Sequence, residues 1–186
     1  MKAVNDEQLQ YVKNLMGNTL NKLRNNDYDL FDLSDEACVY EFDIDKGKLE
    51  RKLHEVCINH RFACYLEDEI KEIQPSYYID IEYNRYYKKA KCVRANGDKK
   101  TFRPDILVHT RATKLDNIPQ HYLIIEAKKE IVSKDDEEKV QAFMIDQNYE
   151  YLFGITIKYG DLKPALCKIF YSLNGKDISC EELIFK

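Results

Sequence analysis

The 186-residue sequence has no run of eighteen apolar residues, and this absence excludes a membrane-spanning helix of ordinary length. It has only six glycines and four prolines, and it has no internal repeat, low-complexity tract or flexible linker. Its six cysteines form no CxxC pair, so we expect buried, reduced thiols rather than disulfides or a zinc site. The first ten residues are too polar and acidic for a secretory signal, which predicts a cytoplasmic protein.

The sequence does contain enough apolar and aromatic residues for one folded domain. Hydrophobic residues make up 44% of the chain, which has 14 tyrosines and 8 phenylalanines. A chain of this length can bury a hydrophobic core of ordinary size. The formal net charge of −4 argues against a protein that coats nucleic acid over its whole surface, but the charge is unevenly distributed.

Hydrophobic periodicity predicts helices and strands along the whole chain. Leucines, Val12 and Met16 recur at three- and four-residue steps and predict a helix over residues 5–25, with Asn5 as its cap. Further helices are expected over residues 48–72 and from Ser133 to about Gln147. Short apolar runs predict strands at residues 38–42, 77–88, 89–94, 100–109, 121–128, 151–157, 165–171 and 179–185.

Two of these strands carry ionisable residues that a protein core would not contain. Asp105 follows Pro104 near the start of one run, while Glu126 and Lys128 end the run that begins at Tyr122. Alternate strand residues point to the same face, so Glu126 and Lys128 project together, and Asp105 lies near them if the strands pair. Two such carboxylates repel each other unless a divalent cation lies between them, and oxygen ligands suit Mg²⁺ or Mn²⁺. The plain alternatives are a turn residue at position 105 and an exposed charged pair at the end of the second strand.

The segment 85–103 has a charge opposite to that of the rest of the chain. Its eight basic residues and one acid give a net charge of +7, so the remainder carries −11. Asn96-Gly97 near its middle predicts the turn of a two-stranded hairpin. A basic hairpin that leads into Asp105 would bring phosphate-binding charge to the carboxylates, although a lysine-rich edge that discourages aggregation would have the same composition. The residues expected to contact nucleic acid here are Arg85, Lys88, Lys89, Lys91, Arg94 and Arg103.

The order of elements and four short motifs resemble the PD-(D/E)XK, or restriction-endonuclease-like, nuclease superfamily. The signature corresponds to Pro104-Asp105 and Glu126-Ala127-Lys128. An uncharacterised bacterial branch is more similar still, through Glu-x-x-x-x-His-Arg-x-Ala-x-Tyr-Leu at residues 55–66, Glu82-Tyr83-Asn84-Arg85, and Pro-Asp-x-x-x-His at residues 104–109. The resemblance covers about residues 50–160. It implies an α/β (α+β) fold with an αβββαβ core, a central mixed sheet flanked by helices, in a nuclease domain over residues 46–186. Residues 1–45 would form an N-terminal helical extension.

The resemblance also implies a role for each matching residue. Asp105 and Glu126 resemble the two metal-binding carboxylates, and the backbone carbonyl of Ala127 commonly completes that site in the superfamily. Lys128 resembles the lysine that positions the attacking water or neutralises the phosphorus centre, and sequence does not decide whether it is charged. Glu55 resembles an additional acid that many members use for a second metal or a metal-bound water.

Two further residues are expected near the substrate. His109 lies on the strand face of Asp105 and is expected either to contact phosphate or to act as a hydrogen-bonded structural histidine. Lys139 lies on the helix after the two strands, at a position from which some superfamily members contact substrate.

The sequence therefore predicts a Mg²⁺- or Mn²⁺-dependent nuclease that hydrolyses DNA phosphodiester bonds, with 5′-phosphate ends implied by the resemblance. A homodimer or a protein partner is also expected, since cutting both strands of a duplex usually needs two subunits. The chief alternative is a non-catalytic nuclease-like module that binds nucleic acid or protein within a defence, repair or mobile-element complex. An antitoxin-like or immunity protein is a further alternative, suggested only by small size and acidity.

Overall fold

The computed structural model describes residues 1–31, 55–72, 74–83, 85–86, 89–90, 92–95, 98–111, 113–160 and 164–185. For residue 29 and for residues 85–86, 89–90, 93–95 and 98–100 it describes the backbone only. The boundary expected at residues 45–46, the strand expected at 38–42 and the first residues of the helix expected at 48–72 lie outside the described residues.

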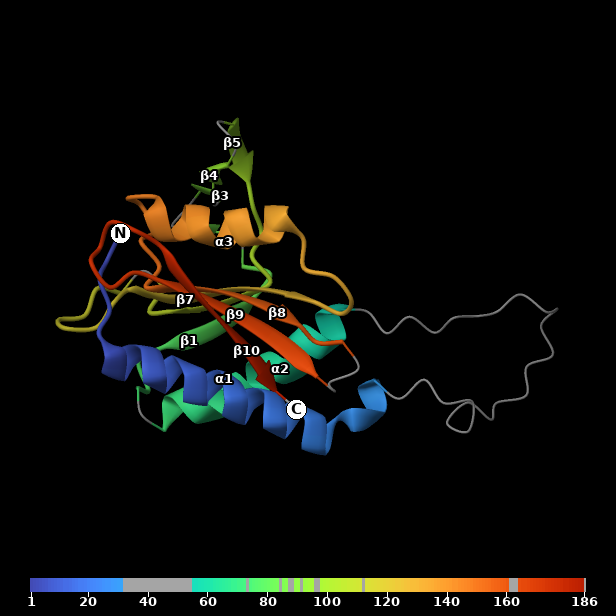
Figure 1. Cartoon of the computed structure of the whole chain (residues 1–186). Helices are drawn as coiled ribbons and strands as arrows, with labels where there is room; N and C mark the ends of the chain where they lie inside the picture. Colours follow the sequence, from blue (N-terminus) through green and yellow to red (C-terminus); the bar gives the residue numbers. More distant parts are fainter. Residues whose placement is uncertain are drawn as a thin grey trace.

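The protein has an α+β fold built around a six-stranded mixed sheet with the strand order β1-β6-β7-β8-β9-β10 (Figure 1). Neighbouring strands run antiparallel except β7 and β8, which run parallel. The strands span Tyr78–Ile81 (β1), Ile106–His109 (β6), His121–Lys128 (β7), Phe153–Lys158 (β8), Ala165–Tyr171 (β9) and Ser179–Phe185 (β10). The parallel step between β7 and β8 requires a crossover, and helix α3 (Lys134–Ile145) provides it.

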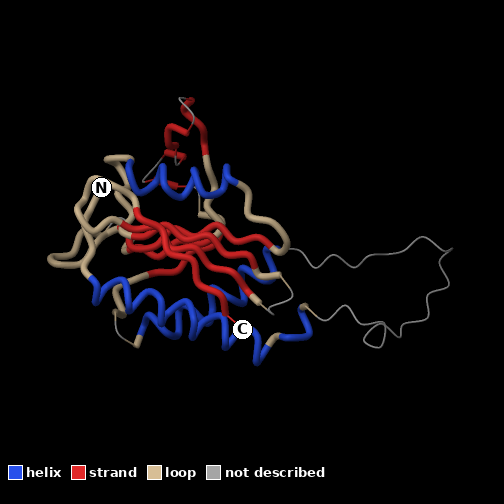
Figure 2. The backbone as a smooth tube through the Cα atoms, in the orientation of Figure 1, coloured by secondary structure: helices blue, strands red, loops and turns tan. Residues whose placement is uncertain are grey.

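Helices cover both faces of this sheet, as Figure 2 shows. Helices α1 (Asp6–Asn26) and α2 (Glu55–Lys71) pack on one face, where their apolar residues join those of β6 to β9 in one buried cluster. Helix α3 packs on the other face, where Val140, Phe143 and Met144 contact Leu107 and Ile124. A short 3₁₀ helix, η1 (Tyr28–Leu30), follows α1. The expectation of a mixed sheet flanked by helices is confirmed.

The capping residues expected from the sequence begin two of the helices. The Asn5 side chain accepts a hydrogen bond from the Gln8 amide, and the Gln8 side chain accepts one from the Asn5 amide. Ser133 and Asp136 form the same reciprocal pair at the start of α3. Each of these reciprocal pairs, known as a capping box, satisfies two amides that have no partner inside the helix, so both helices begin where their caps lie.

Two strand predictions were too long. The expected strand at residues 100–109 is interrupted between Thr101 and Ile106, because Pro104 has no amide hydrogen to give to a ladder. The expected strand at residues 77–88 ends at Ile81, and Glu82 follows with a φ of 48°. Short ribbons occupy the basic segment: β2 (Arg85–Tyr86) pairs with β3 (Lys89–Ala90), and β4 (Cys92–Ala95) pairs with β5 (Asp98–Thr101). The β4–β5 hairpin confirms the one predicted from Asn96-Gly97, and it lies beyond α3 in Figure 1.

The five described cysteines are free thiols, as expected, but most of them are not buried. Cys57, Cys64, Cys92, Cys167 and Cys180 are free thiols, and of these five only Cys167 is buried. The expectation of buried thiols was wrong for Cys57 and Cys180, which lie on the surface of α2 and of the edge strand β10. None of the described helices is long and apolar enough to cross a membrane.

Candidate metal centre

Pairing of β6 with β7 brings Asp105 to the end of β7, as the sequence predicted. Ile106 lies opposite Ile125 in this antiparallel pair, so Asp105 lies level with Glu126. Asp105 Oδ2 accepts a hydrogen bond of 2.9 Å from the Ala127 amide, which ties the carboxylate to the backbone of the neighbouring strand. The position of Asp105 is therefore fixed by the sheet and not by a flexible loop.

The Lys128 ammonium lies among three carboxylates from three elements. Its Nζ is 3.1 Å from Asp105 Oδ2, 3.1 Å from Glu55 Oε1 and 3.8 Å from Glu126 Oε2. Burial alone would lower the pKa of Lys128, but Asp105, Glu55 and Glu126 raise it above its ordinary value. Lys128 is therefore charged at neutral pH, which favours an electrostatic role over that of a general base.

Glu55 reaches this cluster from the first described turn of α2. The buried residues Ile58, Phe62 and Leu66 fall on one face of the helix, and Glu55 continues that face toward the end of the sheet. Its Oε2 also accepts a hydrogen bond of 3.2 Å from the Lys129 amide. The structure thus brings together all four residues expected at the site: Glu55, Asp105, Glu126 and Lys128.

Glu126 is the most deeply buried of the three carboxylates, with only 1% of its surface exposed. Burial and the nearby charge of Asp105 raise its pKa to about 7, although Lys139 and Lys128 act in the opposite direction. Lys139 Nζ on α3 lies 2.5 Å from Glu126 Oε1. No donor in the described part of the chain meets Glu126 Oε1 in hydrogen-bond geometry, so this contact is an ion pair of poor directionality.

The ion pair of Lys139 with Glu126 is the contact that sequence reasoning missed. Lys139 also lies over the ring of Phe102, 5.5 Å from its centroid, and its expected contact with substrate stays a prediction. The sequence does not show which face of α3 packs on β7, because tertiary packing decides how the helix is rotated about its axis.

Pro104 leaves the Ala127 carbonyl without the backbone hydrogen bond that a regular antiparallel ladder would give it. The Asp105 carbonyl accepts from the Glu82 amide on the β1 side, so the backbone groups of residues 104 and 106 point toward β7. The next hydrogen-bonded pair after Ile106 and Ile125 would be Pro104 and Ala127. Proline cannot donate to the Ala127 carbonyl, and that oxygen faces the same side as the Ala127 amide that Asp105 binds.

These groups fit a hard divalent cation. The available donors are carboxylate and carbonyl oxygens, and one buried carboxylate oxygen lacks a well-oriented hydrogen bond. Within the described ranges, no three His, Cys, Asp or Glu side chains are already placed as ligands around one point. The ammonium groups of Lys128 and Lys139 lie against the carboxylates instead, so a cation would have to displace one of them.

No protein-family model, curated protein or solved structure matches this chain. The function proposed below is therefore argued from the side chains of the site and from the motif resemblance.

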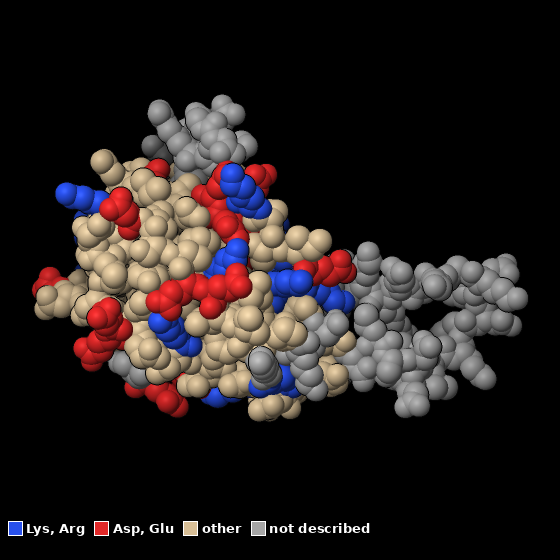
Figure 3. All heavy atoms as spheres, viewed as in Figure 1, with Lys and Arg blue, Asp and Glu red and all other residues tan. Residues whose placement is uncertain are grey.

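The structure describes only some of the residues expected to bind nucleic acid. Lys88 and Lys91 lie outside the described residues, and Arg85, Lys89 and Arg94 have a described backbone in the short ribbons. Arg103 is exposed and pairs with Glu82 at 3.3 Å. Among the coloured residues of the face drawn in Figure 3, basic and acidic side chains are interspersed.

His109 occupies a different site, at the far end of β6 from Asp105. It is 2% exposed, and its Nε2 lies 2.9 Å from Asp80 Oδ2. Arg111 binds the same carboxylate with two nitrogens at 2.8 Å and 3.0 Å, and its guanidinium lies over the ring of Tyr78. This geometry corresponds to the structural histidine that the sequence left open as an alternative to phosphate contact.

Proposed function

We propose that this protein is a divalent-metal-dependent nuclease that hydrolyses DNA phosphodiester bonds. The observation that carries the proposal is the convergence of Glu55, Asp105 and Glu126 on Lys128, with Glu126 1% exposed. Placing three carboxylates beside one another, with Glu126 buried, is costly unless cations neutralise them, and a carboxylate with a strongly perturbed pKa in such a cluster marks a candidate functional site.

The arrangement of the elements supports the finer fold assignment, an αβββαβ core of the restriction-endonuclease-like kind. Helix α2, strands β1, β6 and β7, helix α3 and strand β8 follow one another in this order once the short ribbons are set aside. The four strands are also neighbours in the sheet in the same order. This agreement adds to the motif resemblance because the motifs lie on the elements where the superfamily has them.

Each side chain has a definable part in the proposed reaction. Asp105, Glu126, the Ala127 carbonyl and Glu55 would hold Mg²⁺ or Mn²⁺. Such an ion supplies an acidic bound water and neutralises charge on the phosphoryl oxygens. Lys128, which is an ammonium beside the metal-free carboxylates, would stabilise the charge developing on the phosphate.

DNA is the proposed substrate, and a homodimer is required only if both strands of a duplex are cut. The basic segment 85–103, which enters directly into Asp105, is the proposed source of phosphate contacts. Its net charge of +7 offsets the repulsion that the acidic remainder would exert on DNA.

The test is cleavage by the purified protein in Mg²⁺ or Mn²⁺. We expect the parent protein to cut DNA, and Asp105→Ala, Glu126→Ala and Lys128→Ala to lose at least about a hundredfold in rate, the typical cost of one charged catalytic group. The matched control is Lys176→Ala, an exposed lysine between β9 and β10. Undiminished cutting by Lys128→Ala, with circular dichroism showing a folded protein, contradicts the assigned roles.

A non-catalytic nuclease-like binding module is the second candidate, and one observation favours it. Lysine ammonium groups already neutralise the carboxylates, as they would in a site that never takes a metal. A calorimetric titration with Mn²⁺ distinguishes the two functions. The nuclease binds the ion with an affinity that Asp105→Asn abolishes, whereas a binding module shows no such site.

A further inference from the structure

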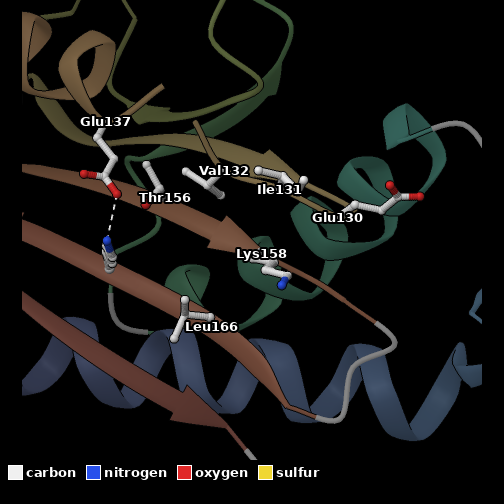
Figure 4. A pocket seen from close by; sticks show the side chains of 8 residues that line it. Glu130, Ile131, Val132, Glu137, Thr156, Lys158 and Leu166 are labelled. Atoms are coloured by element: carbon white, nitrogen blue, oxygen red, sulfur yellow. Dashed lines mark hydrogen bonds and ion pairs between the residues drawn. The ribbon is translucent and has the colours of Figure 1, made fainter. Parts of the chain in front are cut away.

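A hollow of about 180 Å³ adjoins the candidate metal centre on the α3 face of the sheet (Figure 4). Its lining comes from β8, β9, α3 and the loop between β7 and α3, and comprises Glu130, Ile131, Val132, Glu137, Thr156, Lys158, Leu166 and Lys168. In Figure 4, Ile131 and Val132 of the loop lie across from Lys158 and Leu166 of the two strands.

Strand register places this hollow one step from the catalytic groups. In the parallel pair of β7 and β8, Glu126 lies opposite Thr156 and Lys128 lies opposite Lys158. Partners in register share a face and lie about 5 Å apart across the sheet. If one phosphate of a nucleic-acid strand contacts Lys128, the adjacent nucleotide therefore lies next to Lys158 and the hollow.

The lining combines apolar walls with charged side chains of both signs, namely Lys158 and Lys168 from the strands, Glu130 from the loop and Glu137 from α3. Lys168 is paired with Glu137 at 2.8 Å, whereas Lys158 is exposed and forms no ion pair with any described carboxylate. The walls formed by Ile131, Val132 and Leu166 suit the faces of a nucleobase, and apolar side chains hold bases in this way when they leave the stack. Ile131 is 75% exposed, more than the other exposed large hydrophobic residues that the structure describes.

We propose that this hollow receives one unpaired nucleotide next to the phosphate that is cut, with Lys158 on its neighbouring phosphate. The substrate is then a single strand or a frayed end, because a base still paired in a duplex cannot enter a space of this size. This inference rests on the proposed nuclease function, which it deepens by naming the substrate class.

The test uses the complete absence of tryptophan from this chain. Ile131→Trp places a single fluorophore at the mouth of the hollow, and Ile145→Trp places one at the 57%-exposed end of α3, away from it. Both proteins also carry Asp105→Asn, so that the titration in Mg²⁺ measures binding without cutting. The probes are a short single-stranded deoxyoligonucleotide and a closed duplex of the same sequence without free ends.

We expect the single strand to change the fluorescence of Ile131→Trp saturably and at least tenfold more tightly than the closed duplex, while Ile145→Trp does not respond. Adding Lys158→Gln should reduce the slope of log affinity against log salt by about 0.7, the value for one phosphate contact on a single strand. Lys176→Gln, at the other end of β9, should leave the slope unchanged.

The proposal is overturned if neither probe changes the fluorescence of Ile131→Trp, if both probes bind equally, or if Ile145→Trp responds alike. Cleavage assays of the parent protein keep the two proposals apart. Cutting without the fluorescence response leaves the nuclease and removes the nucleotide pocket. The response without cutting leaves the pocket and removes the nuclease.

Discussion

At the scale of single residues, the unusual feature is a carboxylate held where water does not reach it. Glu126 is 1% exposed and is neutralised by ammonium groups from β7 and α3. Its raised pKa records a cost, since the folded protein disfavours the charged form of this side chain. A residue that reduces stability in this way is consistent with selection for chemistry at the site.

This cost predicts a pH dependence of stability. The pKa of Glu126 rises from 4.5 in the unfolded chain to about 7 in the folded protein, so the folded state binds its proton more tightly. The stability that this group contributes is present below pH 4.5 and is lost as the pH rises through 7. Relative to Glu126→Gln, the parent should lose on the order of 1–3 kcal/mol of unfolding free energy over this interval and stay constant above it. Urea unfolding with a chelator present at several pH values measures the difference, and a difference independent of pH contradicts the prediction.

Asp80 should behave in the opposite way. Burial would raise its pKa, but His109 and Arg111 hold the pKa well below its ordinary value. The stability it contributes is present above the unfolded value of 3.8 and is lost as the pH falls toward the folded value. We expect Asp80→Asn to cost about 1–3 kcal/mol at pH 7, because it removes the ion pair with Arg111 and weakens the contact with the buried His109, and to cost less in acid. The same urea experiment tests this, and DNA cutting should remain because the cluster lies at the far end of β6.

Alternation along strands was sufficient to predict which residues of the site share a face, but not their partners. Glu126 and Lys128 follow from the two-residue period, and Asp105 follows from the pairing of two apolar runs. The contacts of Lys128 with Glu55 and of Glu126 with Lys139 cross from strands to helices. Those contacts depend on how each helix is rotated over the sheet, which no local pattern encodes.

At the scale of elements, the packing of α3 on β8 sets the position of Lys139. Gly154 on β8 lies directly beneath the helix, where a methyl group would be 2.8 Å from Met144 Sδ and 3.3 Å from Val140 Cβ. Val140 follows Lys139 in sequence, so a helix displaced by this contact carries Lys139 away from Glu126. Glycine is used here for close approach and not for its backbone freedom.

Gly154→Ala should therefore lower the unfolding free energy by about 1–3 kcal/mol, the usual cost of an overpacked core. Removing the clashing side chain should relieve part of this cost, since the sulfur of Met144 is the nearest atom. In a double-mutant cycle, Gly154→Ala with Met144→Ala should be about 0.5–2 kcal/mol more stable than the sum of the single changes. Strict additivity, measured by urea unfolding, is the result that contradicts this account.

Elements with a strong period and clear ends could be predicted from the sequence. Strands β7, β9 and β10 and helix α1 have ends within about one residue of the predicted ones, because turn residues or a capping box mark them. The basic segment was predicted less well. The strands predicted at residues 77–88 and 100–109, which flank it, run through Glu82 and Pro104, where a positive φ and a missing amide interrupt the ladder.

At the scale of the whole molecule, charge of opposite sign is separated along the chain. Three carboxylates of the acidic remainder, those of Glu55, Asp105 and Glu126, meet at the end of the sheet, and the basic segment leads directly into Asp105. Within the described ranges, Lys128 and Lys139 are the cations that pair with these carboxylates. Metal binding should therefore affect the stability of the entire fold, because β6, β7 and α2 all contribute ligands.

Mn²⁺ should raise the melting temperature of the parent protein, since a ligand present at a hundred times its dissociation constant adds about 2.7 kcal/mol to the unfolding free energy. For a chain of this length that corresponds to roughly 5–10 °C. The increase should be smaller below pH 7, because Glu126 must then release a proton to become a ligand. Asp105→Asn should lose the stabilisation, whereas Lys128→Ala should keep it and still fail to cut DNA, because Lys128 acts on phosphate and holds no metal. A Lys128→Ala protein that loses both properties contradicts this division of roles, and reversal by a chelator controls for irreversible unfolding.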